Sequence, residues 1–438
     1  MNDNTFLILP GCDDTNRGDQ ALIWVTVDLA RKAGFEGTYK MLANANQCAQ
    51  SAQEGIGQVD YVLEHPSARF HNSNNVHYSP ALKLKWACAA VLDFLKCEPL
   101  VHPLLRKLWL PFCGEKTRNA VEAFRKARVC FVKGGGFLHA HGGFADTYKI
   151  YYFLYHIRLA QSFGADVMVM PNSFGPFASP FVKGMIRRTL GKCSVVMARE
   201  SISARSLREA CGIPVEEYAD LAFQLRADQE FDAKGHLNRL GIPVGQKPCV
   251  AITARPYRFP EEADGVQKYE NYKSSLAEFA VWLDQNGFHP VFVEHVFSDM
   301  DHENDMTCID QIRSLLKDKC AYSVFSDRDL SCRQMKSVYA AFDYVIGTRF
   351  HSVIFSLASG TPGIAITYGG NKGDGIMRDL GMEGYAIPIH QISSGELIRR
   401  FEMLHGNRDE TTALLHDAME QIAFQESQIV NRIKELRT

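Results

Sequence analysis

Residues 344–368 read YVIGTRFHSVIFSLASGTPGIAITY and contain a strand, a turn, a helix and a second strand. The apolar run at 344–346 predicts a buried strand, and residues 352–359 have the apolar spacing of a helix. A glycine opens the turn between them, and Arg349 and His351 follow it. In parallel α/β sheets the carboxyl ends of the strands bind ligands, and a helix N-terminus at that place favours anions. The segment therefore predicts a doubly wound α/β fold with an anion site at this turn.

The same alternation of strand and helix runs through most of the chain. Apolar strand segments are expected at 6–9, 129–133, 166–170, 194–198, 249–253, 290–294, 322–325 and 363–367. Helical spacing is expected at 21–32, 147–163, 181–190, 203–210, 272–285, 307–316 and 330–341. A charged segment with several glycines, 228–247, separates two such alternations, which predicts two Rossmann-like domains facing each other across a cleft. The expected organisation is an N-terminal domain at 1–226, a C-terminal domain at 247–394 and a helical tail at 395–438.

Composition narrows the class of protein. The chain has 438 residues and a formal net charge of -2, so it has no overall positive field for nucleic acid. Its 12 cysteines form no CxxC pair, which favours reduced thiols in a cytoplasmic protein. The first residues lack the basic and apolar pattern of a signal peptide, and no apolar run reaches the length that crosses a bilayer.

One long apolar segment, 82–113, is interrupted by lysines and a few other charges. The first interpretation is a pair of amphipathic helices that pack against the core. The second is a surface that touches the inner face of a membrane or a lipid-linked substrate. Both interpretations stay open at this stage.

Polar groups also follow the strands of the first half. Asn16 and Asp19 lie in the loop after the first strand, where they either grip substrate hydroxyls or cap the next helix. Gly135 and Gly136 follow the strand at 129–133 and either approach a ligand closely or form a tight turn. His139 either contacts a sugar or makes local hydrogen bonds; with His141 it forms a His-x-His pair for which no third metal ligand is identifiable.

Two cations and an acidic run complete the candidates. Arg199 ends a strand and either binds an anion or forms a surface ion pair. Lys372 lies in a glycine-rich loop after the strand at 363–367, so Arg349, His351 and Lys372 are expected to project into one place. The acidic run 299–305 is either a metal-binding Asp-x-Asp segment or a solvated loop with helix-capping acids.

At this point the sequence resembles the polysaccharide pyruvyl transferase family. The resemblance lies in NRGD at 16–19, KGGG at 133–136, NSFGP at 172–176, ARESIS at 198–203, ADLAF at 219–223, and above all 347–368 with Lys372. Phe350 stands where the family commonly has Leu, and Glu200 where it commonly has Asp; neither change removes a reacting group.

The resemblance implies a glycosyltransferase-B-like fold and a defined reaction. Members of the family move the pyruvyl group of phosphoenolpyruvate onto two hydroxyls of a sugar as a cyclic ketal and release phosphate, without a metal or cofactor. Carried over to this chain, Arg199, Arg349 and Lys372 bind phosphoenolpyruvate, and His351 is the general acid. The residues expected on the acceptor side or in the cleft are Asn16, Asp19, Gly135, Gly136, His139 and Asn172.

Two other functions stay open. One is a sugar-nucleotide-dependent glycosyltransferase of the same fold, in which the basic strand ends hold a diphosphate. The other is a glycan-binding protein without catalysis. The expected partners are phosphoenolpyruvate and a saccharide acceptor, lipid-linked or free.

Overall fold

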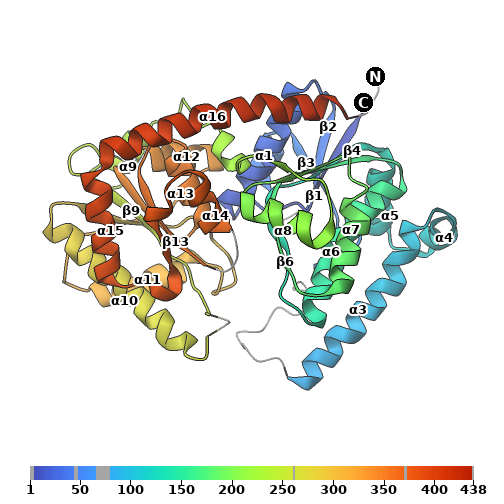
Figure 1. The fold of residues 1–438 in the computed structure, drawn as a ribbon, viewed down its shortest axis with the longest axis horizontal. Coiled ribbons are helices and arrows are strands. Elements are labelled where there is room, and N and C mark those ends of the chain that lie inside the picture. Colours follow the sequence, from blue (N-terminus) through green and yellow to red (C-terminus); the bar gives the residue numbers. More distant parts are fainter. Residues whose placement is uncertain (1–3, 44–47, 66–78, 260–261, 369–371, 437–438) are drawn as a thin grey trace. The chain divides into compact units, whose positions relative to one another are not determined.

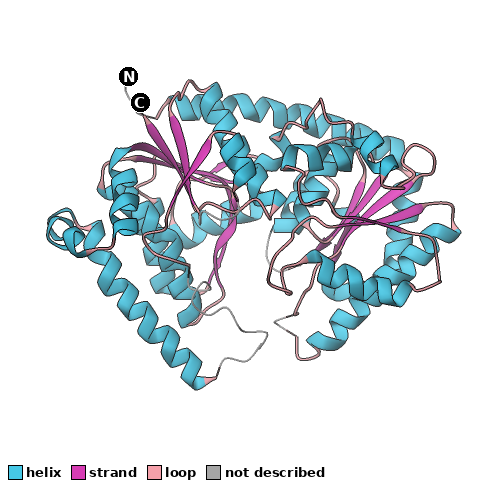
Figure 2. Ribbon diagram, turned by 180° about the vertical axis from the view of Figure 1, so that it is seen from behind, coloured by secondary structure: helices cyan, strands magenta, loops and turns pink. Residues whose placement is uncertain are grey.

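A computed structural model describes residues 4–43, 48–65, 79–259, 262–368 and 372–436 of the chain. The chain divides into two compact units. Unit 1 comprises the residues up to Asp14, Leu22–Leu221 and the residues from Gln425 on. Unit 2 comprises Thr15–Ala21 and Ala222–Phe424. Figure 1 shows both units coloured along the sequence, and Figure 2 shows their strands and helices from behind.

Unit 1 is built on one sheet of eight strands. They are β1 (Thr5–Leu9), β2 (Thr38–Leu42), β3 (Ile56–Val59), β4 (Ala127–Val132), β5 (Gly135–Ala140), β6 (Asp166–Phe177), β7 (Val195–Ala198) and β8 (Glu216–Glu217). Their order is β3-β2-β1-β4-β6-β7-β8, β5 pairs with β6, and the neighbouring strands run parallel.

Helices cover both faces of this sheet, as parallel sheets require. They are α1 (Arg17–Lys32), α2 (Ala49–Gln53), α3 (Pro80–Val101), α4 (Pro103–Trp109), η2 (Leu110–Phe112), α5 (Glu115–Lys126), α6 (Phe144–Ser162), α7 (Pro180–Leu190) and α8 (Ser201–Cys211). Leu7 and Leu9 point into the core under α5 to α8. Phe6 points to the opposite face and contacts Phe35, which follows α1, at 5.3 Å between ring centres. The alternation follows from the two-residue period of a strand.

Unit 2 repeats the plan with six parallel strands in the order β11-β10-β9-β12-β13-β14. The strands are β9 (Cys249–Thr253), β10 (His289–Val293), β11 (Ser323–Phe325), β12 (Tyr344–Gly347), β13 (Gly363–Thr367) and β14 (Ala386–Pro388). The helices are η3 (Leu221–Gln224), α9 (Ala233–Arg239), α10 (Gly265–Gln285), α11 (Asp305–Leu316), α12 (Cys332–Ala340), α13 (Phe350–Leu357), α14 (Lys372–Asp379), η4 (Glu383–Tyr385), η5 (Ile389–Gln391), α15 (Ser394–Gly406) and α16 (Arg408–Lys434). Strands β9, β12 and β13 share a buried core with α10, α11 and α15.

In each sheet the strand order reverses once. The reversal falls between β1 and β4 in unit 1, and between β9 and β12 in unit 2. The crevice at the carboxyl ends of two such strands is where open parallel sheets bind ligands. The strand order therefore predicts ligand-binding residues just after β9 and β12 in unit 2, and just after β1 and β4 in unit 1.

The predicted doubly wound α/β class is confirmed, and the structure adds detail at the domain boundaries. Residues Thr15–Ala21 group with unit 2 rather than with the N-terminal unit. The tail expected at 395–438 is divided, because α16 begins in unit 2 and its residues from Gln425 on belong to unit 1. Strands β2, β3, β5, β8 and β14 are additions that the apolar pattern did not predict.

Candidate functional site

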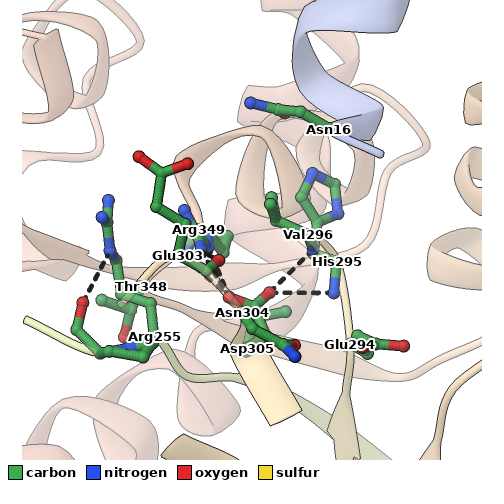
Figure 3. Close-up of polar contacts among 12 residues, drawn as sticks. Asn16, Arg255, Glu294, His295, Val296, Glu303, Asn304, Asp305, Thr348 and Arg349 are labelled. Atoms are coloured by element: carbon green, nitrogen blue, oxygen red, sulfur yellow. Dashed lines mark hydrogen bonds and ion pairs between the residues drawn. The ribbon is translucent and has the colours of Figure 1, made fainter. Parts of the chain in front are cut away.

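Two arginines leave the adjacent strands at the reversal point of unit 2. Arg255 lies two residues beyond the end of β9, and Arg349 lies two residues beyond the end of β12. The strand ends are tied together, since the N–H of Thr348 donates to the carbonyl oxygen of Thr253 at 3.0 Å. The N–H of Arg349 then donates to Thr253 Oγ1 at 3.2 Å. Figure 3 shows both arginines at this edge of the sheet.

Arg349 is held rigidly by an acid at the start of α11. Its Nε donates to Asp305 Oδ1 at 2.7 Å, and its Nη2 donates to the carbonyl oxygen of Glu303 at 2.6 Å. Asp305 Oδ2 accepts from the backbone N–H groups of His295 and Val296 at 3.0 and 2.9 Å (Figure 3). Burial raises the pKa of the Asp305 carboxyl, against the opposing effects of Arg349 and these two N–H groups. The Arg349 side chain is fixed in direction and keeps 11% of its surface exposed.

Arg255 has a different environment. Its Nη1 donates to the hydroxyl of Tyr368 at 2.5 Å, and its guanidinium lies 4.8 Å from the centre of the Tyr368 ring. Its backbone N–H donates to the hydroxyl of Tyr272 at 3.3 Å. Within the described residues no carboxylate lies within 4.0 Å of this guanidinium. Burial opposes the charge of Arg255, but the Tyr368 hydroxyl and the nearby carboxylates of Asp305 and Glu303 raise its pKa.

His351 is the second residue of α13, which begins directly after Arg349. Gly18, in the first turn of α1, lies against its imidazole: a Cβ added to Gly18 would stand 2.0 Å from His351 Nδ1. Both residues belong to unit 2. The first turn of α1 thus forms one wall of the histidine site, and only glycine fits there.

This contact corrects the expectation for Asn16 and Asp19, which were assigned to the first domain. Asn16 forms an antiparallel bridge with Val296, and the segment that contains both polar residues groups with unit 2. Asn16 Oδ1 accepts from the N–H groups of Gly18 and Asp19 at 3.1 and 3.3 Å, and its Nδ2 donates to Asp19 Oδ2 at 3.0 Å. Its side chain therefore satisfies free N–H groups at the start of α1, as in the capping interpretation.

In unit 1, Arg199 lies after β7 with its side chain fully buried. Its Nη1 donates to Asp220 Oδ2 and its Nε to Ser173 Oγ, both at 2.7 Å, and Nε lies 3.6 Å from Glu200 Oε2. Burial raises the pKa of Glu200. The Nη2 of Arg199 is buried without a hydrogen-bond partner among the described residues, and a Cβ added to Gly136 would stand 3.0 Å from it. The surface ion-pair interpretation of Arg199 is wrong, since this arginine is part of a buried network.

Asn172 connects the strand ends of unit 1. Its Nδ2 donates to the backbone carbonyl oxygen of Lys133 at 2.8 Å. Its own backbone carbonyl oxygen accepts from the N–H of Arg199 at 3.1 Å. Gly134 allows the chain to pass close by, because a Cβ there would lie 2.7 Å from the carbonyl oxygen of Pro171. Asn172 is fully buried within β6 and ties this strand to the ends of β4 and β7.

Gly135 and Gly136 begin β5, and His139 lies further along the same strand. His139 is exposed, and its Nδ1 lies 2.9 Å from the carbonyl oxygen of Gly136. Its ring centre lies 5.6 Å from that of His141. Across the part of the chain that the structure describes, no group of three His, Cys, Asp or Glu side chains is arranged to hold a metal ion.

Arg349 and His351 lie two residues apart at the start of α13 in unit 2, whereas Arg199 belongs to unit 1. Lys372 is the first residue of α14, and its side chain lies outside the described residues. Sequence reasoning missed Arg255, although its place directly after an apolar strand carried the same signal as Arg199. It also misread Asp305, which is a buried partner of Arg349 and not a member of a solvated loop.

Comparisons with known proteins identify the family and the fold of the chain. The 26% identity to the amylovoran biosynthesis protein AmsJ of Erwinia amylovora extends over 260 residues, 58% of this chain and 61% of that protein. The chain thus matches about six tenths of the length of this curated relative. Among solved structures, Anabaena HepE in complex with UDP-glucose aligns with a TM-score of 0.56 at 12% identity, covering 98% of each chain. The UDP-GlcNAc 2-epimerase of Neisseria meningitidis aligns with 0.53 at 11% identity over 98% of this chain and 99% of the other, so the fold is glycosyltransferase-B-like. The family profile described as polysaccharide pyruvyl transferase matches residues 16–370, and the chain belongs to this family.

Proposed function

We propose that this protein transfers the pyruvyl group of phosphoenolpyruvate onto two hydroxyls of a sugar in a polysaccharide or its precursor, with release of phosphate. The observation that carries the proposal is the reversal point of unit 2, where Arg255 and Arg349 leave adjacent strands beside His351. Family membership and the relative named for amylovoran biosynthesis support a transferase of polysaccharide assembly.

The charges of this edge suit phosphoenolpyruvate. The molecule carries a carboxylate and a phosphate, about three negative charges near neutral pH. A guanidinium offers a planar pair of donors to either group. Arg349 is fixed by Asp305, so it suits the carboxylate, which has to be held in one direction from donor to product. Arg255, without a carboxylate partner among the described residues, and Lys372 then suit the phosphate.

His351 has the role of general acid in this proposal. It delivers a proton to the terminal CH₂ carbon of the enol, while a sugar hydroxyl adds to the neighbouring carbon and loses its proton. The bond from that carbon to the phosphate oxygen then breaks, phosphate leaves, and the second hydroxyl closes the ketal and gives up its proton. Imidazole suits the first step because its pKa lies near neutrality.

The strand ends of unit 1 supply the remaining groups of the proposal. His139 is exposed beside Gly136, so it suits a sugar hydroxyl of the acceptor. Arg199 retains one buried nitrogen, Nη2, without a partner among the described residues, facing Gly136. A contact between Arg199 and phosphoenolpyruvate has to use this nitrogen, because Nη1 and Nε are engaged by Asp220 and Ser173.

The test is phosphate release from phosphoenolpyruvate across a panel of galactosides, mannosides and glucosides, with NMR to locate the ketal. Sugar nucleotides serve as competing donors, and turnover with them alone would contradict the proposal. His351→Gln should lower kcat by about 10²–10⁴-fold, the usual contribution of a general acid, with little change in the KM for phosphoenolpyruvate. The matched control is His416→Gln on α16, where the histidine is 71% exposed. Near-normal turnover of folded His351→Gln would remove the general-acid assignment.

A further inference from the structure

Unit 1 carries an unusually apolar surface on α3, α4 and η2, which we call the α3–α4 surface. Leu104 is 79% exposed, Leu108 72% and Phe112 85%. The other large apolar side chains exposed on it are Leu84, Val91, Leu92, Phe94, Leu95, Leu105 and Trp109. Figure 1 shows α3 extending beyond the sheet of unit 1, with α4 at its C-terminal end. Exposed apolar area of this extent in a soluble domain marks an interaction site.

The packing of α3 explains why these side chains stay exposed. Its buried residues are Ala90, Asp93, Cys97, Leu100 and Val101, all within the last twelve residues of a helix of 22 residues. They recur every three or four residues and form one narrow stripe against the core. The first ten residues bury no side chain, although they include Leu84 and Trp86. The expectation that amphipathic helices in residues 82–113 pack against the core is therefore met only by this stripe of α3.

The exposed charges on this surface and in the first turn of α5 beside it are mostly positive. Between residues 79 and 118, all of which the structure describes, the exposed basic side chains are Lys83, Lys85, Lys96, Lys107, Lys116 and Arg118. Glu115 is the one exposed acid of that segment. The other two acids are engaged: Asp93 accepts from the hydroxyl of Tyr148, and Glu98 forms an ion pair with Arg158. Lysine stems can lie along an apolar surface while their ammonium groups reach outward.

A groove continues the apolar surface onto α7. A cavity of about 320 Å³ lies between α3, α6 and α7, lined by residues that include Phe94, Leu95, Tyr151 and Met185. Phe181, at the start of α7, lines it as well and is 65% exposed. The sequence of α7, PFVKGMIRRTL, contains three basic residues and no acid. The neighbouring helix thus repeats the combination of exposed apolar and basic side chains.

We propose that the α3–α4 surface docks this protein onto an anionic phospholipid bilayer. Apolar side chains interleaved with lysines match a bilayer in which acyl chains lie beneath negative headgroups. Among the described residues no helix is long and apolar enough to cross a membrane, so the helices would lie in the interface. A second copy of the chain suits the surface less well, because pairing the surface with itself would bring its four exposed lysines, Lys83, Lys85, Lys96 and Lys107, against those of the other copy.

The experiment measures binding of the full chain to phosphatidylcholine vesicles with and without phosphatidylglycerol, by sedimentation. The test variant is Leu104→Glu/Leu108→Glu, and the control is Leu240→Glu/Val266→Glu, which adds the same charges at exposed apolar residues of unit 2. We expect the wild type to bind vesicles that contain phosphatidylglycerol, with affinity that falls as salt rises. The test variant should bind at least about tenfold more weakly, and the control should bind like the wild type.

A second variant separates the charges from the apolar side chains. Lys96→Glu/Lys107→Glu should weaken binding to anionic vesicles by at least about tenfold, because each cation near such a surface contributes favourably. Light scattering of the lipid-free protein tests whether a second copy of the chain covers the surface instead of a bilayer. The proposal is overturned if the wild type does not bind anionic vesicles, or if both test variants bind as the wild type does. It is also overturned if Leu104→Glu/Leu108→Glu dissociates a dimer and leaves vesicle binding unchanged.

Discussion

Replacing Asp305 with Asn tests whether a buried ion pair holds Arg349 in place. Asp305 is fully buried, and Arg349 keeps 11% of its side-chain surface exposed, so the pair is largely shielded from water. The carboxylate receives Arg349 Nε at 2.7 Å and two backbone N–H groups at 2.9 and 3.0 Å. Asparagine keeps one oxygen for the backbone but turns an NH₂ donor toward the guanidinium. Removing one partner of a buried ion pair costs about 3–5 kcal/mol.

The same helix supplies a matched control. Asp310 of α11 pairs with Arg313 at 2.8 Å, but the two side chains are 57% and 48% exposed. Exposed pairs contribute about 0–1 kcal/mol. We therefore expect Asp305→Asn to lower the free energy of unfolding by about 3 kcal/mol, at the lower end of the buried range because one acceptor remains. Asp310→Asn should lower it by less than about 1 kcal/mol.

The assay is differential scanning calorimetry of the full chain. For a unit of about 200 residues, 3 kcal/mol corresponds to a decrease of roughly 6–12 °C in the melting temperature of unit 2. The variant should also bind phosphoenolpyruvate more weakly, because Arg349 loses its fixed direction. A loss below about 1 kcal/mol, equal to that of Asp310→Asn, would refute the reasoning. It would mean that burial keeps the Asp305 carboxyl protonated and that Arg349 has no charged partner.

Two further predictions concern Gly18 and Glu396. Gly18→Ala places a methyl group against the His351 ring and should lower kcat and stability. Gly184→Ala in α7, where a Cβ meets no described atom within 4 Å, should instead stabilise by about 0.5–1 kcal/mol, and equal stabilisation by both would exclude the clash. Hydrogen bonds from the arginines three and four residues further along α15 lower the pKa of Glu396 to about 2. The stabilising contribution of ionised Glu396 is complete above its pKa in the unfolded chain and is lost as the pH falls toward 2. Because Glu396→Gln removes this contribution, the free energy of unfolding should fall less between pH 7 and pH 3 in the variant than in the wild type, by about 1 kcal/mol or less. Urea unfolding near pH 3 and pH 7 measures this difference.

The sheets and their helices could be predicted because buried parallel strands read as short apolar runs. The nine predicted strands all exist, and Tyr344–Gly347 and Gly363–Thr367 lie within one residue of their predicted bounds. Ile56–Val59 was missed because it is a short edge strand that contains a glycine. Ala386–Pro388 is an edge strand of three residues, too short for a periodic pattern.

The candidate site could be predicted only where a residue directly follows a strand. Arg349 and Arg199 were found by that rule, which is local in sequence. The acid that pairs with each arginine is distant in the sequence. Asp305 lies 44 residues before Arg349, and Asp220 lies 21 residues after Arg199. An acid in a charged loop has the same sequence pattern whether it is solvated or buried. The grouping of Gly18 with the second unit was unpredictable for a similar reason, since its contact with His351 is set by the fold.

The two arginines of unit 2 differ in what they can offer a ligand. Arg349 has its Nε and Nη2 engaged by Asp305 and by the carbonyl oxygen of Glu303, so its remaining donors point in a direction set by α11. Its charge is largely balanced by Asp305. Arg255 is engaged by the neutral hydroxyl and ring of Tyr368, and the carboxylates of Asp305 and Glu303 influence its charge without a hydrogen bond to it. In the proposed reaction, direction matters for the carboxylate that stays on the product, and charge matters for the phosphate that leaves. We therefore propose the first task for Arg349 and the second for Arg255.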